Sequence, residues 1–106
     1  MATRRVIWTE IAVKQRRSIL NYWAKRNGNK VYATKIIQIT NTFLSEIALK
    51  PDLFRTIDLV NVRCASMGNF SIYYTLSATD IIVLAFWDNR QNPEKLLSII
   101  SQNNSM

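Results

Sequence analysis

The chain has 106 residues, 48% of them hydrophobic, and only two glycines and two prolines. This composition predicts one globular domain with a modest core, and it excludes collagen-like and low-complexity chains. The net charge of +7 indicates an anionic partner, either an acidic protein or a nucleic acid. No stretch approaches about 18 apolar residues and no secretory signal is visible, so we expect no membrane contact and a cytoplasmic protein.

The positive charge lies mainly in the N-terminal third of the chain. Residues 1–35 hold nine lysines and arginines against one acid, Glu10, while residues 36–106 have a net charge of −1. With no histidine and a single cysteine, Cys64, the chain lacks the usual zinc patterns and a serine triad. We therefore expect no metal and no cofactor.

The first half of the chain predicts a short strand and two helices. Residues 4–8 can form the strand, and residues 9–27 have helical periodicity. Gly28 suits the position after a helix, and Asn29 can accept an N–H bond at the start of the next helix. That second helix must end before Pro51. Its apolar stripe has helical spacing and comprises Tyr32, Ile36, Ile39, Phe43, Leu44 and Ile47.

The second half predicts an antiparallel sheet with the helical hairpin packed on one of its faces. We take 66–68 as a three-residue hairpin loop, which pairs Val62 with Ile72 and Arg63 with Ser71. The next hairpin has residues 78–79 at its tip, which pairs Tyr74 with Val83 and Ile72 with Ala85. In this register the helix-facing side holds Val62, Cys64, Phe70, Ile72, Tyr74, Val83, Ala85 and Trp87.

The opposite face of the sheet is the predicted binding surface. It carries Arg63, Tyr73, Phe86 and Arg90, and exposed aromatics beside arginines are typical of a recognition face. The alternative is that a short C-terminal helix covers this face, because Leu96, Leu97 and Ile100 need burial. Arg90 also has an alternative role, in which it pairs with Asp88 or Glu94.

Several motifs carry a resemblance to a known family. They include Trp8–Ala12 (WTEIA), Ile19–Trp23 (ILNYW), Val62–Cys64 (VRC), Gly68–Tyr74 (GNFSIYY) and Phe86–Pro93 (FWDNRQNP). In this order the chain resembles toxins of the RelE/ParE superfamily of bacterial type II toxin–antitoxin modules, also called plasmid stabilisation proteins. The resemblance implies an α+β domain over residues 1–100, in which a short strand and a helical hairpin precede the sheet and a short helix follows it. Residues 101–106 are then a flexible tail.

The resemblance also implies a function and partners. Such a toxin is neutralised by a cognate antitoxin, which is usually acidic, and operator DNA is bound only through the antitoxin. ParE-like members are associated with inhibition of DNA gyrase, whereas RelE-like members cut mRNA on the ribosome. For this chain the resemblance leaves open whether it is an enzyme; if it is, it would be an mRNA endoribonuclease. A third possibility is an interaction module that has lost its toxicity.

The hypothesis of a nuclease would depend on two arginines. Arg63 and Arg90 match arginines of RelE-like nucleases, which use lysines, arginines and a C-terminal tyrosine around the sheet. Here no lysine lies between Lys50 and Lys95, and no tyrosine follows Tyr74. We therefore expect ParE-like action on gyrase or another essential target, with mRNA cleavage as the alternative. Beyond the sheet, four helical cations are predicted to bind an acidic antitoxin or target: Arg16, Arg17, Lys25 and Arg26.

Overall fold

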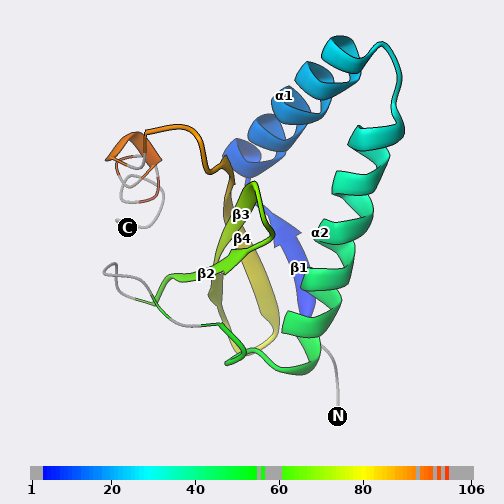
Figure 1. Ribbon diagram of the computed structural model, residues 1–106. Coiled ribbons are helices and arrows are strands. Elements are labelled where there is room, and N and C mark those ends of the chain that lie inside the picture. The colour runs from blue at the N-terminus through cyan, green and yellow to red at the C-terminus, as the bar shows by residue number, and fades with distance from the viewer. Residues whose placement is uncertain are drawn as a thin grey trace.

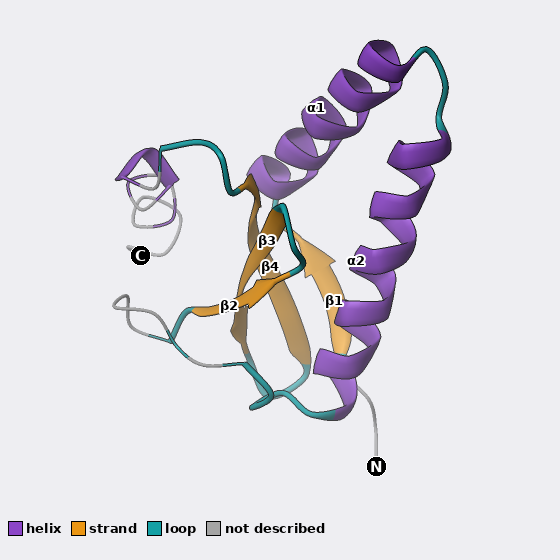
Figure 2. Cartoon of the chain, in the orientation of Figure 1, coloured by secondary structure: helices purple, strands orange, loops and turns teal. Residues whose placement is uncertain are grey.

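The computed structural model describes residues 4–54, 56, 61–92, 94–96, 98 and 100. In chain order the elements are β1 (Arg5–Trp8), α1 (Glu10–Asn27), α2 (Val31–Leu49), β2 (Arg63–Ser66), β3 (Phe70–Leu76) and β4 (Asp80–Asp88). The described residues between 94 and 100 are helical. The two long helices form a hairpin on one side of the sheet, and the C-terminal helical segment lies on the other side (Figures 1 and 2).

The sheet is mixed rather than wholly antiparallel, which corrects the prediction in one respect. The strand order is β1-β4-β3-β2, and β1 runs parallel to β4. The α+β fold is otherwise as predicted. The helical hairpin separates β1 from β2 along the chain. As a result β1 lies beside β4, the last strand in the sequence, and not beside β2. Consequently β1 and β2 are the two edges of the sheet.

The ends of the helices follow the predicted capping signals. The Thr9 hydroxyl accepts the Ala12 N–H at 3.2 Å, and Gly28 follows α1 with a φ of 69°. Asn29 accepts the Val31 N–H through Oδ1 at 3.0 Å, although Lys30 occupies the N-cap position of α2, where its side chain makes no capping bond. The second helix ends at Leu49, before the proline that cannot follow in a helical conformation.

The register of β2 against β3 differs from the prediction. Arg63 pairs with Tyr74, and the loop consists of Gly68 and Asn69. Gly68 has a φ of 85°, as the first central residue of a two-residue II′ hairpin requires. Asn89 stabilises this loop, because its backbone N–H donates to the Asn69 carbonyl and its side-chain amide donates to the Gly68 carbonyl, both at 2.9 Å. Because this shift in pairing exchanges the two faces of β2, the Arg63 side chain lies on the same side of the sheet as the helices.

A bulge in β4 corrects the second part of the predicted register. Tyr74 pairs with Val83 as predicted, but Tyr73 pairs with Ala85, so Leu84 is the extra residue. The bulge lies where β1 ends and α1 begins. There the Thr9 hydroxyl donates to the Leu84 carbonyl at 3.3 Å, and the Phe86 N–H donates to Gln15 Oε1 at 2.8 Å. The side chains of the α1 cap residue Thr9 and of Gln15 in α1 thus bond to β4 beyond the end of β1, where no strand of the described residues lies beside it on that side.

The bulge divides the apolar residues of β4 between two cores. The helix-side core contains Ala12, Ile36, Leu44, Ile47, Ala65, Phe70, Ile72, Tyr74, Ile81, Val83 and Phe86. The core on the other face contains Val62, Leu84, Ala85, Trp87, Leu96 and Ile100. The predicted alternative, a C-terminal segment covering this face, is therefore confirmed for Leu96 and Ile100. The predicted open aromatic face was wrong; Leu97 and the predicted tail, 101–106, lie outside the described residues.

Candidate functional site

The outer edge of β1 presents unpaired backbone groups. The Arg5 N–H donates to the Thr79 carbonyl at 2.9 Å, and the Thr9 N–H donates to the Val83 carbonyl at 3.1 Å. Because alternate residues of a parallel strand bond to the same neighbour, the backbone groups of Val6 and Trp8 point away from the sheet. Val6 and Ile7 are also exposed, by 37% and 42%. Such an edge can accept another strand.

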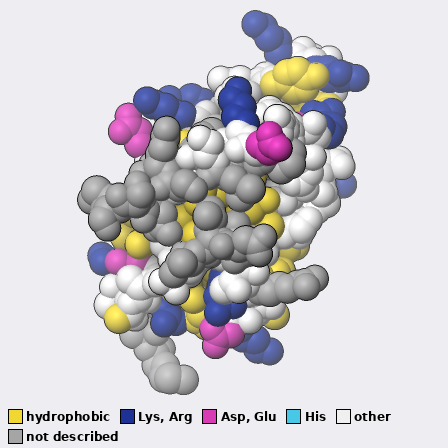
Figure 3. All heavy atoms as spheres, turned by 90° about the vertical axis from the view of Figure 1, so that its left-hand side faces the viewer, with side chains coloured by type: hydrophobic (Ala, Val, Ile, Leu, Met, Phe, Trp, Pro, Cys, Tyr) yellow, Lys and Arg dark blue, Asp and Glu magenta, His cyan; other side chains and the backbone are white. Residues whose placement is uncertain are grey.

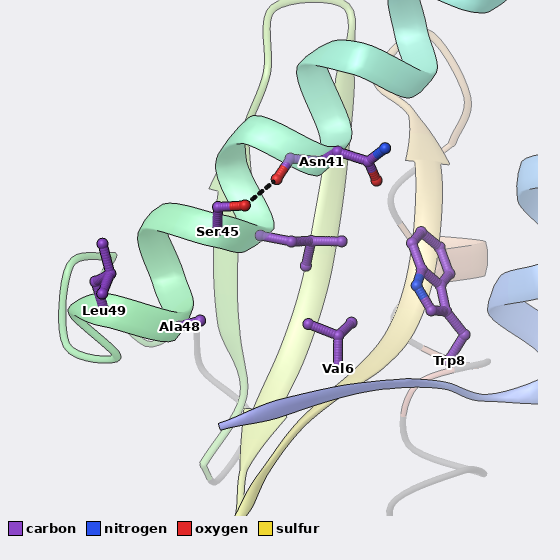
Figure 4. A pocket seen from close by; sticks show the side chains of 7 residues that line it. Val6, Trp8, Asn41, Ser45, Ala48 and Leu49 are labelled. Carbon is purple, nitrogen blue, oxygen red and sulfur yellow. Dashed lines mark hydrogen bonds between the residues drawn. The ribbon is translucent and has the colours of Figure 1, made fainter. Parts of the chain in front are cut away.

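An apolar groove lies beside this edge, between β1 and α2. It has a volume of about 520 Å³ and is lined by Val6, Trp8, Asn41, Leu44, Ser45, Ala48 and Leu49. Figure 4 shows Val6 and Trp8 rising from β1 toward the last turns of α2. The Ser45 hydroxyl donates to the Asn41 carbonyl at 2.9 Å, so it makes its bond within the helix. We call this surface the β1–α2 groove.

One arginine flanks the β1–α2 groove. The Arg16 guanidinium lies 4.4 Å from the centre of the Trp8 ring, so this predicted binding residue stacks on a groove wall. Arg5 is on the same edge strand, but its side chain alternates with those of Val6 and Trp8 and so lies on the other face of the sheet, where it pairs with Asp80 at 3.0 Å. A groove with apolar walls and a cation beside it fits an amphipathic acidic segment.

A second recess, the α1–β4 cleft, lies between α1 and the end of β4. One part measures about 400 Å³ and is lined by Ser18, Ile19, Tyr22, Trp23, Asp88, Arg90 and Gln91. The adjoining part measures about 220 Å³ and is lined by Gln15, Ser18, Ile19, Phe86, Trp87, Asp88, Gln91 and Lys95. The two parts share four lining residues, so they form one cleft along α1. None of its lining residues belongs to the β1–α2 groove.

The structure brings Arg90 and Arg26 to the same aromatic side chain at this cleft. Their guanidinium carbons lie 5.1 Å and 5.5 Å from the centre of the Trp23 ring. Arg26 also donates to the Tyr22 hydroxyl at 3.1 Å. Stacking on an indole ring is favourable for arginine and restricts the orientation of its planar head group.

A buried carboxylate fixes Arg90 from the other side. Arg90 donates from Nε to Asp88 Oδ1 at 3.0 Å and from Nη2 to Oδ2 at 2.6 Å, which is the predicted alternative for this residue. The Asp88 side chain is 8% exposed, whereas that of Arg90 is 56% exposed. The hydrogen bonds from Arg90 lower the pKa of the Asp88 carboxyl below its ordinary value. The carboxylate is thus ionised at neutral pH and holds the arginine in place.

Arg63 is far from Arg90 and has a different environment. Its guanidinium donates to the Phe54 carbonyl and to the Asp52 carboxylate at 3.3 Å. Arg63 is level with Tyr74 on β3, whereas Asp88 is level with Phe70. From strand geometry these positions are about 13 Å apart along the strands and about 10 Å apart across them. The two arginines therefore do not form one phosphate site.

The remaining predicted site residues have separate places. Phe86 is 1% exposed and lies in the helix-side core, so the prediction that it is an exposed binding residue was wrong. Tyr73 does lie on the far face, but it packs against the C-terminal core, where burial raises the pKa of its hydroxyl. Arg17 and Lys25 are exposed on α1. Figure 3 shows lysines and arginines gathered around an apolar patch at the top of the molecule, where the hairpin turns.

Several residues of these two surfaces were missed by sequence reasoning. Neither Trp23 nor Tyr22 was among the predicted site residues. The spacing of Tyr22 and Arg26, four positions apart on a helix, was an available signal for their contact. By contrast, nothing local pairs Trp23 with Arg90, because 67 positions of sequence separate them.

The fold is that of a small α+β protein with a helical hairpin on a mixed sheet, and comparisons with known proteins agree with it. The family model described as ParE toxin of type II toxin-antitoxin system, parDE, matches residues 6–93. The chain therefore belongs to the ParE toxin family. A solved structure described as a chromosomal ParDE TA system from P. aeruginosa is similar, with a TM-score of 0.66 and 16% identity. The match covers 81% of this chain and 96% of that one.

The comparison with curated proteins finds no match for this chain. Within the part of the chain that the structure describes, none of the helices has the length and apolar character needed to cross a membrane.

Proposed function

We propose that this chain is the toxin of a type II toxin–antitoxin module, that an acidic antitoxin neutralises it, and that it acts without cutting RNA. Its target would be DNA gyrase or another essential protein of the cell, as for ParE-like toxins. The observation that carries the proposal is the separation of Arg63 from Arg90, combined with the ion pair that each makes with a carboxylate.

Cleavage of RNA through its 2′-hydroxyl needs a proton acceptor and several cations around one phosphate. The two candidate arginines lie at different strands and different levels of the sheet. Asp52 accepts a bond from Arg63, and Asp88 accepts two bonds from the Arg90 side chain. Because each arginine is already paired with a carboxylate, it gives less stabilisation to the additional negative charge that develops on a phosphate during cleavage. This arrangement favours recognition of a protein over RNA cleavage.

The β1–α2 groove supports neutralisation by an antitoxin. Its walls are apolar, and its edge strand offers the unpaired backbone groups of Val6 and Trp8. A segment of the antitoxin would add a strand beside β1 and place apolar side chains against Leu44 and Ala48. An acidic residue next to that segment would meet Arg16. The chain's net charge of +7 favours fast association with such a partner.

Expression of the chain from an inducible promoter in a sensitive bacterium tests the proposal. We expect growth arrest with filamentation and an SOS response, and no new mRNA ends at ribosomal A-site codons. Arrest should be relieved by co-expression of a small acidic protein encoded beside the toxin gene. Normal growth would contradict the toxin assignment. A-site cleavage that is lost in both Arg63→Ala and Arg90→Ala would instead establish the nuclease.

A further inference from the structure

We propose that the α1–β4 cleft is a second binding site, which takes an acidic, extended segment of the protein that the toxin inhibits. The inference rests on the proposed function in one respect, namely that the toxin has a protein target. The inference identifies the surface of the toxin that binds the target and the chemical group of the target that this surface recognises. A carboxylate of the segment would meet Arg90, and its apolar side chains would meet the wall of α1.

The lining of the cleft contains two cationic side chains and one carboxylate. Arg90 lies at one part of the cleft and Lys95 lines the other. The Ser18 hydroxyl and the Gln91 amide lie in both parts, and each can donate or accept. The single carboxylate of the lining, Asp88, already accepts three bonds from Arg90 through its two oxygens. The two cations and the donors that remain free therefore favour a ligand that is negatively charged and rich in hydrogen-bond acceptors.

Arg90 is positioned for binding before the ligand arrives. Asp88 holds Nε and Nη2, the indole ring of Trp23 lies beside the guanidinium, and the other guanidinium nitrogen, Nη1, makes no bond within the described part of the chain. A guanidinium fixed in this way loses little freedom when a carboxylate binds, so more of the interaction energy contributes to affinity. More than half of its surface is still open to solvent.

The dimensions of the cleft fit a short extended peptide. Its lining on α1 runs from Gln15 to Trp23, which is about 12 Å at the rise of an α-helix. An extended chain covers that length with about four residues. Ile19 lines both parts of the cleft and Phe86 lines the part that contains Lys95, so both contribute to an apolar wall. A segment with acidic residues at both ends and apolar residues between them is complementary to this arrangement.

Charge favours a protein segment over a nucleic acid at this site. Asp88 partly compensates Arg90, and Glu94 directly precedes Lys95 in the chain. A nucleic acid strand is held by several cations along its phosphates, and the cleft does not provide such a row. An isolated carboxylate needs one well-oriented arginine, which it does provide.

Binding is tested with a blocked tetrapeptide that has glutamates at its ends and leucines between them. Its titration is followed by the NMR signal of the Trp23 indole N–H, which is buried and has no acceptor among the described residues. We expect the signal to shift, and the shift to vanish with glutamines in place of the glutamates. Stronger binding of a single-stranded oligonucleotide than of the acidic peptide would overturn the proposal.

Two variants test the residues. Asp88→Asn combined with Arg90→Gln removes both charges of the pair without leaving a buried carboxylate unpaired, and it should weaken peptide binding about tenfold or more. Trp23→Phe is the second variant and keeps an aromatic ring in the helix. Its peptide binding is measured by fluorescence anisotropy of a labelled peptide, and we expect a several-fold loss of affinity. The double variant keeps the net charge of +7, so Lys30→Gln is the control for the loss of a single cation elsewhere, because Lys30 is exposed and outside both surfaces. Unchanged binding in both cleft variants would disprove the site.

Growth assays separate this inference from the proposed function. If the site holds the target, the double variant should lose growth inhibition and still bind the antitoxin, while Lys30→Gln keeps both properties. Loss of antitoxin binding in the double variant would make the antitoxin the occupant and overturn the inference. A wild-type chain that never inhibits growth would defeat the proposed function. Full toxicity of both folded cleft variants would defeat only the cleft as the target site.

Discussion

The β1–α2 groove and the α1–β4 cleft lie on two sides of one aromatic stack but differ in how they can recognise a partner. The rings of Trp8, which lines the groove, and Phe86, which lines the cleft, have their centres 6.2 Å apart. The groove offers apolar walls and unpaired backbone. The cleft offers an arginine held by a carboxylate and an indole ring. A small toxin can therefore present two separate surfaces, one selected by apolar contact and one by charge.

Replacing Phe86 tests whether the two surfaces depend on one core residue. The ring stacks with Trp8 and lies 6.1 Å from the centre of the Phe70 ring. Phe86→Ala should lower the free energy of unfolding by about 3–5 kcal/mol, because it leaves a cavity between the groove and the cleft. Urea denaturation measures the loss, with the exposed residue change Val31→Ala as control. A loss below about 1 kcal/mol would mean that the two surfaces are independently supported.

The apolar character of the groove can be tested with two residues of equal exposure. Leu49 lines the groove and Val31 lies outside it, and both are 76% exposed. Leu49→Asp should weaken antitoxin binding by about 10- to 100-fold, or about 1.4–2.8 kcal/mol, because it places a charge against an apolar partner surface. Val31→Asp should leave the affinity nearly unchanged. Calorimetric titration with the antitoxin measures both, and equal effects would remove the groove as the binding site.

The sequence was sufficient to predict the helical half of the fold for local reasons. Thr9, Gly28 and Asn29 act within a few positions of themselves, and Pro51 prevents the helix from continuing. Each of these signals depends on the local backbone conformation, which the residue itself and its near neighbours in the sequence determine. The presence of a helical hairpin on one face of a sheet followed from them and from the apolar stripes.

The sheet register, by contrast, depends on contacts between distant parts of the chain. The bulge at Leu84 is stabilised by side chains of Thr9 and Gln15, and Asn89 bonds to the loop at Gly68. An error of one strand position exchanges the faces, so Phe86 and Arg63 were assigned to the wrong side. The same limit applies to the site. Arg26 and Arg90 were predicted separately, but only the folded chain shows that both stack on Trp23.

Thr9 is placed where β1 ends and α1 begins, between the groove and the cleft. Its hydroxyl accepts the Ala12 N–H and donates to the Leu84 carbonyl. Thr9→Ala should therefore lower the free energy of unfolding by about 1–2 kcal/mol, as loss of a helix cap does. Thr42→Ala is the matched control, because that hydroxyl is exposed and bonds only within α2 at 3.0 Å. An equal loss in both variants would show that the bond to the bulge contributes nothing.

The pH dependence of stability gives the smallest effect and tests the charged character of the cleft. Bonds from Arg90 lower the pKa of Asp88 below its ordinary value of 3.8, so the folded state binds the proton less readily than the unfolded state. The stabilisation is then fully present above about pH 4 and is lost as the pH falls through the lowered pKa. Asp88→Asn should be less stable than the wild type at neutral pH, and this difference should shrink in acid.

Asp52→Asn distinguishes this effect from a general change in net charge. The Asp52 side chain is 90% exposed and pairs with Arg63 on the other edge of the sheet. Chemical denaturation between about pH 2 and pH 7 measures all three proteins. If the stability difference between the wild type and Asp88→Asn stayed constant through the acid range, the Asp88–Arg90 pair would not hold its charge in the fold. Arg90 would then lack the fixed orientation that distinguishes the cleft from the groove.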